Sequence, residues 1–205
     1  MSPFSYPKVR HNRTLTPGPY KRYQSYKDAL RQEFGNKCVY CCAPDLGLKH
    51  TYAVEHYRPK KKFPLFACDY KNLYYACPAC NTHKGSFWPT RSQRLNGEFI
   101  PNPCDHVMFS HLRYSGGQVY AQSPTGIFAS QVLDLNSPGA VTHRQAIEAA
   151  INGLEGQLSD AKKLMAWLSQ QVASGNISQQ DHDAEMNRLT TLASGLEANI
   201  KHFGG

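Results

Sequence analysis

Four cysteines arranged as two pairs are the residues of this chain whose chemistry is easiest to name. Cys38 and Cys41 form one Cys-x-x-Cys pair, Cys77 and Cys80 form a second, and 35 residues separate the two pairs. Four thiolates complete the tetrahedral shell of Zn²⁺ and leave no open position for a substrate, so such a site is structural. The spacing therefore predicts one structural zinc ion, and the alternative is four buried thiols without a metal.

The segment between the two cysteine pairs, with the residue that follows the second pair, carries residue types that suit hydrolysis of a phosphodiester bond. Glu55 and His56 are adjacent, Asn72 precedes the second pair and Asn81 follows it. The reaction needs a base that deprotonates water and a cation that stabilises the leaving oxygen. His56 is the candidate base because imidazole titrates near neutral pH, and Glu55 and Asn81 offer oxygen ligands to Mg²⁺ or Mn²⁺. The alternative is a structural Glu55–His56 pair and a turn at Asn72.

This combination resembles the HNH endonuclease family over roughly residues 36–88. The resemblance implies a ββα-metal core, with Asn72 as a central residue that pins the loop by backbone hydrogen bonds and so orients His56. Two positions depart from the family pattern: Glu55 stands where many members have Asp or His, and Asn81 where His is common. His83 is a poor substitute ligand for Asn81, because two residues along a helix turn a side chain by about 200°.

Basic residues lie close to these candidates. Arg58, Lys60, Lys61 and Lys62 follow His56 directly, and Lys84 ends the second motif. Residues 1–100 hold 17 Lys and Arg against 6 Asp and Glu, whereas residues 141–205 hold 5 against 7. A basic surface attracts polyanions, so we expect nucleic acid to be the partner and these five residues to contact its phosphates. The alternative is ordinary solvated charge.

The elements that must position these residues form three segments. We expect residues 1–21 to be a basic extended arm and residues 22–136 to be a nuclease domain with its motif core at 36–88. Within it, residues 23–34 predict a short helix, and residues 118–121 and 127–129 are strand-like, with a turn at Gly116 and Gly117. Residues 137–205 have apolar positions at helical spacing on both sides of a break at 174–176, which predicts an antiparallel helical hairpin for packing or partner docking. The expected fold is α+β: a small zinc-stabilised ββα-metal core with a C-terminal α-helical hairpin.

The bulk composition limits the class of protein. The chain has 205 residues, 40% of them hydrophobic, and contains no run of eighteen apolar residues, so we expect no membrane span. The N-terminal residues lack the apolar stretch of a secretory signal, and cysteine pairs at this spacing suit a reducing compartment. We therefore expect a cytoplasmic protein, and the resemblance described next implies a bacterial one.

A narrower resemblance extends over residues 36–148. The segments 54–60, 69–73, 87–89 and 99–105, with Arg144 downstream, are similar to an HNH subfamily that accompanies ATPases in bacterial anti-phage systems of the Septu and retron-linked kind. The resemblance implies an effector nuclease that is held in check by an ATPase partner.

Three functions remain open from the sequence. The favoured one is a metal-dependent endonuclease that cuts double-stranded DNA with little sequence preference, and the same machinery could cut RNA, including tRNA. The second is a zinc-stabilised module that binds nucleic acid without cutting it. The third is a protein adaptor whose function lies in the helical hairpin.

Overall fold

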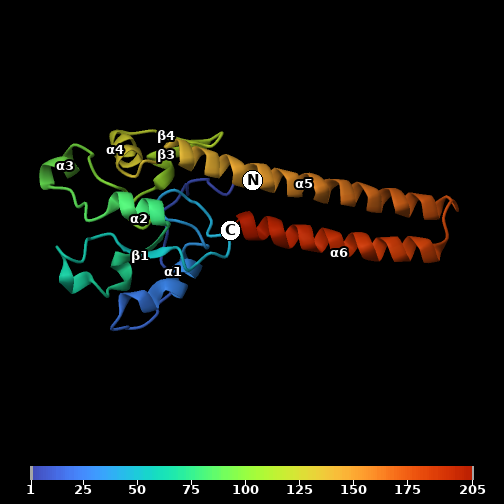
Figure 1. Ribbon diagram of the computed structural model, residues 1–205, viewed down its shortest axis with the longest axis horizontal. Coiled ribbons are helices and arrows are strands. Elements are labelled where there is room, and N and C mark those ends of the chain that lie inside the picture. Colours follow the sequence, from blue (N-terminus) through green and yellow to red (C-terminus); the bar gives the residue numbers. More distant parts are fainter. Residues whose placement is uncertain (1, 205) are drawn as a thin grey trace. The chain divides into compact units, whose positions relative to one another are not determined.

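The computed structural model describes residues 2–204, which divide into two compact units, one ending at Gln145 and the other beginning at Ala146 (Figure 1). The terminal residues 1 and 205 of the predicted arm and hairpin lie outside the described residues. The chain combines helices with small antiparallel sheets, so the α+β class is confirmed.

The motif region folds as two strands and a helix. Strand β1 (Ala53–His56) pairs antiparallel with β2 (Leu73–Ala76), and His56 lies opposite Leu73 in the register. Helix α2 (Pro78–Lys84) follows β2 after one residue, Cys77. Cys77 caps α2 by accepting a hydrogen bond from the Cys80 amide, and Pro78 occupies the first turn, where a missing N–H costs nothing. Gly85 ends the helix with a positive φ of 49°.

The rest of the first unit surrounds this region with short elements. In chain order they are the 3₁₀ turn η1 (Tyr23–Tyr26), α1 (Lys27–Glu33), η2 (Pro64–Phe66), η3 (Tyr70–Asn72), α3 (Arg91–Leu95), η4 (Met108–Ser110), β3 (Leu112–Ser115), β4 (Gln118–Ala121) and α4 (Pro124–Val132). Gly116 and Gly117 join β3 to β4 with positive φ angles of 58° and 85°, as a tight turn requires.

The structure differs from the sequence predictions in two local elements. The helix predicted at 23–34 begins instead as the 3₁₀ turn η1 and becomes α-helical at Lys27. The strand-like reading of residues 127–129 is wrong, because they lie inside α4. Ser123 accepts a hydrogen bond from the Gly126 amide and Pro124 starts the first turn, so the N-terminal cap outweighs the β propensity of Ile127 and Phe128.

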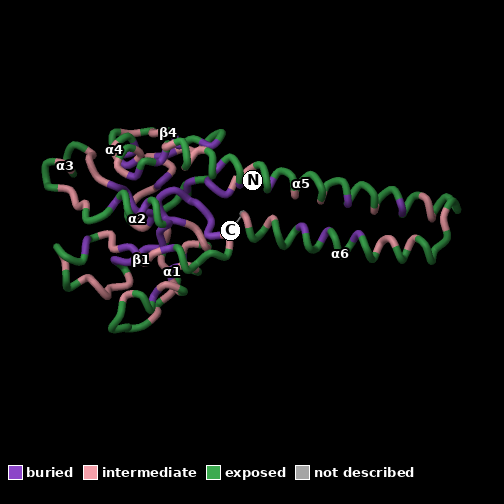
Figure 2. Tube along the Cα trace, viewed as in Figure 1, coloured by how far each residue is buried: buried purple, intermediate pink, exposed green. Residues whose placement is uncertain are grey.

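The core of the first unit is rich in buried aromatic side chains. Tyr40, Tyr75 and Phe4 are fully buried, together with Leu30 and Leu73 (Figure 2). Buried tyrosines require partners for their hydroxyl groups, and those of Tyr40 and Tyr75 donate to Glu55 and Asp45 respectively. The buried tyrosines therefore hold the carboxylates of Glu55 and Asp45 in place within the motif region.

The N-terminal arm has no helix or strand in its described part, residues 2–21, but is fastened to the first unit. Glu33 of α1 accepts hydrogen bonds from the amides of Thr14 and Leu15 at 2.8 and 3.0 Å and contacts His11 Nε2 at 3.0 Å. Burial alone would raise the pKa of Glu33, but these hydrogen bonds and one from Tyr70 outweigh burial and lower it to about 2.

Glu33→Gln is expected to lower the free energy of unfolding by about 1–3 kcal/mol at pH 7, because the carboxylate accepts hydrogen bonds from the Thr14 and Leu15 amides and from Tyr70 that an amide oxygen accepts less strongly. This contribution is fully present above the unfolded value of 4.5 and is lost only as the pH falls from 4.5 towards 2. Urea unfolding of both proteins in a His11→Ala background, which removes the imidazole that contacts Glu33, should therefore give a constant difference between pH 5.5 and 8. A difference that shrinks within that range would contradict the assignment.

The second unit is formed by two long helices, α5 (Pro138–Ala173), whose first turns belong to the first unit, and α6 (Gln179–Gly204). They run antiparallel, and Ala161 and Leu168 of α5 share a buried cluster with Leu189 of α6 (Figures 1 and 2). Lys162 and Glu197 pair across the two helices at 2.8 Å. Ser178 accepts a hydrogen bond from the Asp181 amide and so caps α6. Neither helix, nor any other within residues 2–204, has the length and apolar character needed to cross a bilayer.

Candidate functional site

The four cysteines of the two pairs come together in one buried cluster. Their sulfur atoms all lie within 4.8 Å of one another, and Cys41 Sγ is 3.7 Å from Cys77 Sγ. A tetrahedral shell with Zn–S bonds of about 2.3 Å places its sulfurs about 3.8 Å apart. The donor set and its spacing therefore fit zinc, and the cluster could hold a structural metal of this kind. Cys42 is buried but lies outside the cluster.

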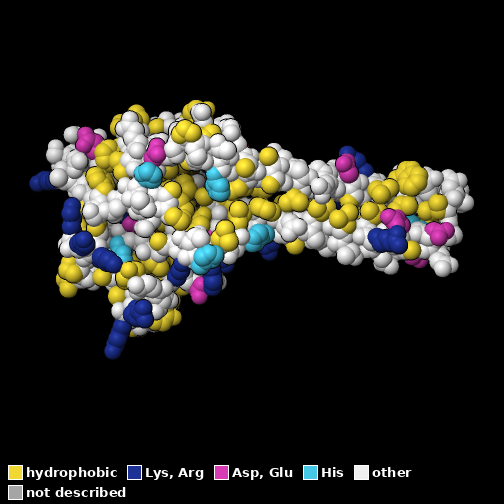
Figure 3. All heavy atoms as spheres, in the orientation of Figure 1, with side chains coloured by type: hydrophobic (Ala, Val, Ile, Leu, Met, Phe, Trp, Pro, Cys, Tyr) yellow, Lys and Arg dark blue, Asp and Glu magenta, His cyan; other side chains and the backbone are white. Residues whose placement is uncertain are grey.

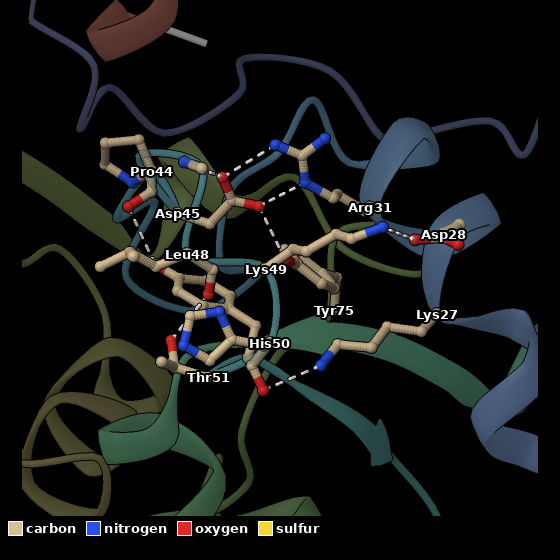
Figure 4. Close-up of polar contacts among 12 residues, drawn as sticks. Lys27, Asp28, Arg31, Pro44, Asp45, Leu48, Lys49, His50, Thr51 and Tyr75 are labelled. Carbon is tan, nitrogen blue, oxygen red and sulfur yellow. Dashed lines mark hydrogen bonds and ion pairs between the residues drawn. The ribbon is translucent and has the colours of Figure 1, made fainter.

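Asp45 fixes the loop that follows the first cysteine pair. Its carboxylate, 1% exposed, accepts hydrogen bonds from the guanidinium of Arg31 on α1 and from the hydroxyl of Tyr75 on β2 (Figure 4). The Val39 amide also donates to the Tyr75 carbonyl at 3.0 Å. The first pair is thus held against β2, whose end leads directly to the second pair.

Asn72 organises the loop between β1 and β2. Its side-chain amide donates to the carbonyls of Arg58 and Phe66, both at 3.1 Å, and its Oδ1 accepts from the Arg58 amide at 2.8 Å. The Asn72 carbonyl accepts from the Tyr57 amide at 3.0 Å. Asn72 is buried and has no free oxygen directed at a ligand, so it fixes the backbone next to His56.

His56, at the end of β1, has its ring held in one orientation. Nε2 lies 3.0 Å from the Ala67 carbonyl oxygen, and the ring packs edge-on against Tyr23 at 4.6 Å. A carbonyl only accepts, so Nε2 carries the proton and the neutral ring has its lone pair on Nδ1. Burial lowers the pKa of His56, and the nearby charges of Lys60 and Lys84 act in the same direction. The neutral imidazole, the form that can accept a proton, is therefore favoured.

Glu55 and Lys84 do not lie as the sequence analysis expected. We expected a carboxylate open to a cation and a lysine open to phosphate, but both side chains are buried, 3% and 2% exposed, and form an ion pair at 2.5 Å. Glu55 also accepts from Tyr40 at 2.7 Å, and Lys84 donates to the His56 carbonyl at 2.9 Å. A cation on Glu55 would have to replace Lys84, and Lys84 acts here as a link between α2 and the end of β1. Tyr40, inside the first cysteine pair, is a member of this cluster that sequence patterns did not reveal.

Asn81 and His83 lie on different sides of α2. Asn81 precedes Lys84 by three residues, so it shares the face that turns towards Glu55 and His56. His83 is exposed and its Nε2 is 4.0 Å from Asp134. The structure thus brings Glu55 and Lys84 together at the His56 carbonyl. Helix spacing places Asn81 on the side of Lys84, and His83 lies on the exposed side of α2.

The cationic residues of the loop after His56 point to solvent. Arg58, Lys60, Lys61 and Lys62 are all exposed, and Lys60 Nζ lies 3.1 Å from the Tyr23 hydroxyl. On the face shown in Figure 3, several Lys and Arg side chains gather on the first unit. Of the five basic residues predicted to contact phosphate, four are exposed and Lys84 is buried.

Lys84→Met is expected to lower the free energy of unfolding by about 3 kcal/mol, because it leaves the buried Glu55 carboxylate without its counter-charge. Lys60→Met, which changes an exposed lysine of the same charge, should alter it by less than about 0.5 kcal/mol. Urea unfolding in the presence of zinc measures both. Equal stability of the two variants would show that the Glu55–Lys84 pair contributes nothing.

Comparison with known proteins gives one relative of interest. No family model matches the chain, and no solved structure matches it. The chain is 28% identical over 109 residues to the Septu protein PtuB of Bacillus thuringiensis. This similarity supports a Septu-type family. The match covers 53% of this chain and 42% of PtuB, so it spans less than half of that relative's length.

Proposed function

We propose that the chain is an HNH-type metal-dependent endonuclease of a Septu-type anti-phage system. The observation that carries the proposal is the His56 ring, which is held at Nε2 by the Ala67 carbonyl in a loop that Asn72 pins by hydrogen bonds. A lone imidazole is common in proteins, but a neutral imidazole whose orientation is fixed in this way is suited to activating water.

In the proposed reaction, His56 Nδ1 accepts the proton of a water molecule that attacks the phosphorus atom. Asn72 acts through the backbone, since its hydrogen bonds fix the loop that carries Ala67 and Arg58. Arg58 and the exposed lysines Lys60, Lys61 and Lys62 hold the phosphates on either side of the scissile bond. A Mg²⁺ or Mn²⁺ ion bound by Asn81, and by Glu55 once Lys84 has moved aside, would stabilise the negative charge on the leaving oxygen.

The similarity to a Septu protein supports the defence role and, with it, an ATPase partner. The partner would hold the nuclease inactive until infection, and the long α5–α6 unit offers a large surface for a docking protein. Affinity purification of the tagged chain from the bacterium that encodes it should recover an ATPase in a fixed ratio. Recovery of the chain alone at micromolar concentration would contradict the proposal of an ATPase partner.

The substrate class is tested by incubating the purified chain, and the chain purified with its partner, with plasmid DNA and with structured RNA. Mg²⁺-dependent cleavage of plasmid DNA is the expected result, with 5′-phosphate ends if the 3′ oxygen is the leaving group. Cleavage of RNA alone would replace DNA by RNA as the substrate. Binding without cleavage under every condition would instead favour the non-catalytic module.

A further inference from the structure

A pocket adjoins the candidate site, and apart from Arg58 and Asn72 the residues that line it have no part in the reaction described above. It has a volume of about 530 Å³, is lined among others by Arg58, Asn72, Trp88 and Arg94, and is called the Trp88 pocket below. Its volume lies within the range of sites that enclose a small organic ligand. Because Arg58 and Asn72 belong to the loop that follows His56, a ligand in this pocket would lie next to the candidate catalytic residues.

The pocket offers a surface on which a flat ring can stack. Trp88 is partly buried, and Tyr57 and Phe63 hold it by edge contacts at 5.7 and 5.1 Å between ring centres. The guanidinium carbons of Arg94 and Arg58 lie 5.1 and 5.8 Å from the centre of the Trp88 ring. Nucleobases stack on indole rings and on guanidinium planes alike, and these groups are provided here by a rigid aromatic cluster.

The pocket also has an excess of positive charge. Two carboxylates line the pocket, those of Asp69 and Asp105. Four cationic side chains line it as well, those of Arg13, Arg58, Lys71 and Arg94. None of the four forms an ion pair with a carboxylate within residues 2–204, whereas Asp105 accepts from the Asn102 side chain and Asp69 from the Lys71 amide. Arg13 is fixed by a 2.7 Å hydrogen bond to the Leu73 carbonyl. Unneutralised guanidinium groups favour a ligand that carries phosphate.

We propose that the Trp88 pocket binds one unstacked nucleotide of the substrate, with its base against Trp88 and its phosphates at Arg58 and Arg94. A base inside an uninterrupted duplex is covered by its neighbours and cannot enter such a pocket. The chain should therefore prefer single-stranded or looped nucleic acid to a plain duplex. This inference deepens the proposed nuclease function, but binding can be measured without cleavage.

The first test uses Trp88 as its own reporter. The chain has two tryptophans, and the other, Trp167, is 51% exposed on α5. A His56→Ala, Trp167→Phe double variant without added Mg²⁺ leaves Trp88 as the only indole and prevents cleavage. Adding a 12-nucleotide single strand should quench its fluorescence with a Kd at least about 10-fold lower than that of a 12-base-pair duplex. Equal affinity for both, or no quenching at saturation, would overturn the proposal.

The second test compares variants by the anisotropy of a labelled single strand. Trp88→Leu should bind about 10-fold more weakly or worse, Trp88→Phe should lose less because it keeps a ring, and Trp167→Leu should bind as wild type. If Trp88→Leu does not fold, Arg94→Gln at an exposed position replaces it, with weaker binding and a smaller salt dependence expected. Unchanged binding by a folded Trp88→Leu or Arg94→Gln would contradict the pocket. Binding that depends on Trp88 in a wild-type protein that never cuts would retain the pocket and refute the nuclease.

Discussion

Replacing His56 by alanine is expected to lower the rate of phosphodiester cleavage by about 10²–10⁴-fold, the range over which a positioned base accelerates proton transfer. The ring contacts the protein through the Ala67 carbonyl and Tyr23, and its Nδ1 is left to accept a proton from water. Single-turnover rates under saturating protein measure the effect. Because His56 does not belong to the cysteine cluster, the zinc content should not change.

The matched control for this variant is His50→Ala. His50 is exposed on the loop between the first cysteine pair and β1, and among residues 2–204 its hydrogen bond is made by its carbonyl, which accepts from Lys27. Its replacement should leave cleavage at the wild-type rate. Imidazole added to the His56→Ala protein should restore part of the activity, since it can fill the space of the lost ring. A His56→Ala protein that keeps half of the wild-type rate would remove His56 from the reaction.

Replacing Cys77 by serine is expected to unfold the first unit. Cys77 contributes one of four sulfurs and also caps α2, so its loss breaks the metal shell and the helix that carries Asn81. Structural zinc sites contribute on the order of 10 kcal/mol to folding, which is comparable with the whole stability of a small domain. The purified variant should contain less than one zinc per chain and show no cooperative thermal transition for this unit.

Cys68→Ser is the control for the cysteine prediction. Cys68 lies outside the cluster, is partly exposed, and donates to the Lys21 carbonyl at 3.3 Å, a contact that serine can also make. Its zinc content and Tm should match the wild type. A soluble Cys77→Ser protein with wild-type zinc content and Tm would refute the structural zinc site.

Features that a sequence motif marks directly were predictable. The spacing of Cys38, Cys41, Cys77 and Cys80 predicted a cluster, and the structure brings their sulfurs within 4.8 Å. The glycine pair at 116–117 predicted a turn that the structure contains. The error at residues 127–129 came from weighing β propensity above the Ser-Pro cap signal four residues earlier.

Features set by the packing of distant segments were not predictable. Lysine side chains are normally exposed, and no residue close to Lys84 in the sequence indicates that it is buried beside Glu55. Lys84 is buried because α2 packs against β1, which carries Glu55. The Trp88 pocket likewise joins Arg13, Arg58, Trp88 and Arg94, which no motif connects. The roles of His56, Glu55 and Asn81 in catalysis stay predictions.

The most direct test of the nuclease assignment is the cleavage rate of the chain purified with its partner from phage-infected cells, in which the proposed inhibition is released (the activated complex). Wild type and His56→Ala are compared on nucleic acid that contains both duplex and single-stranded segments, with Mg²⁺ and without an added divalent cation. We expect rapid cleavage only by the wild type, and only when Mg²⁺ is present. Cleavage by His56→Ala at the wild-type rate, or cleavage by neither protein in the activated complex, would contradict this expectation.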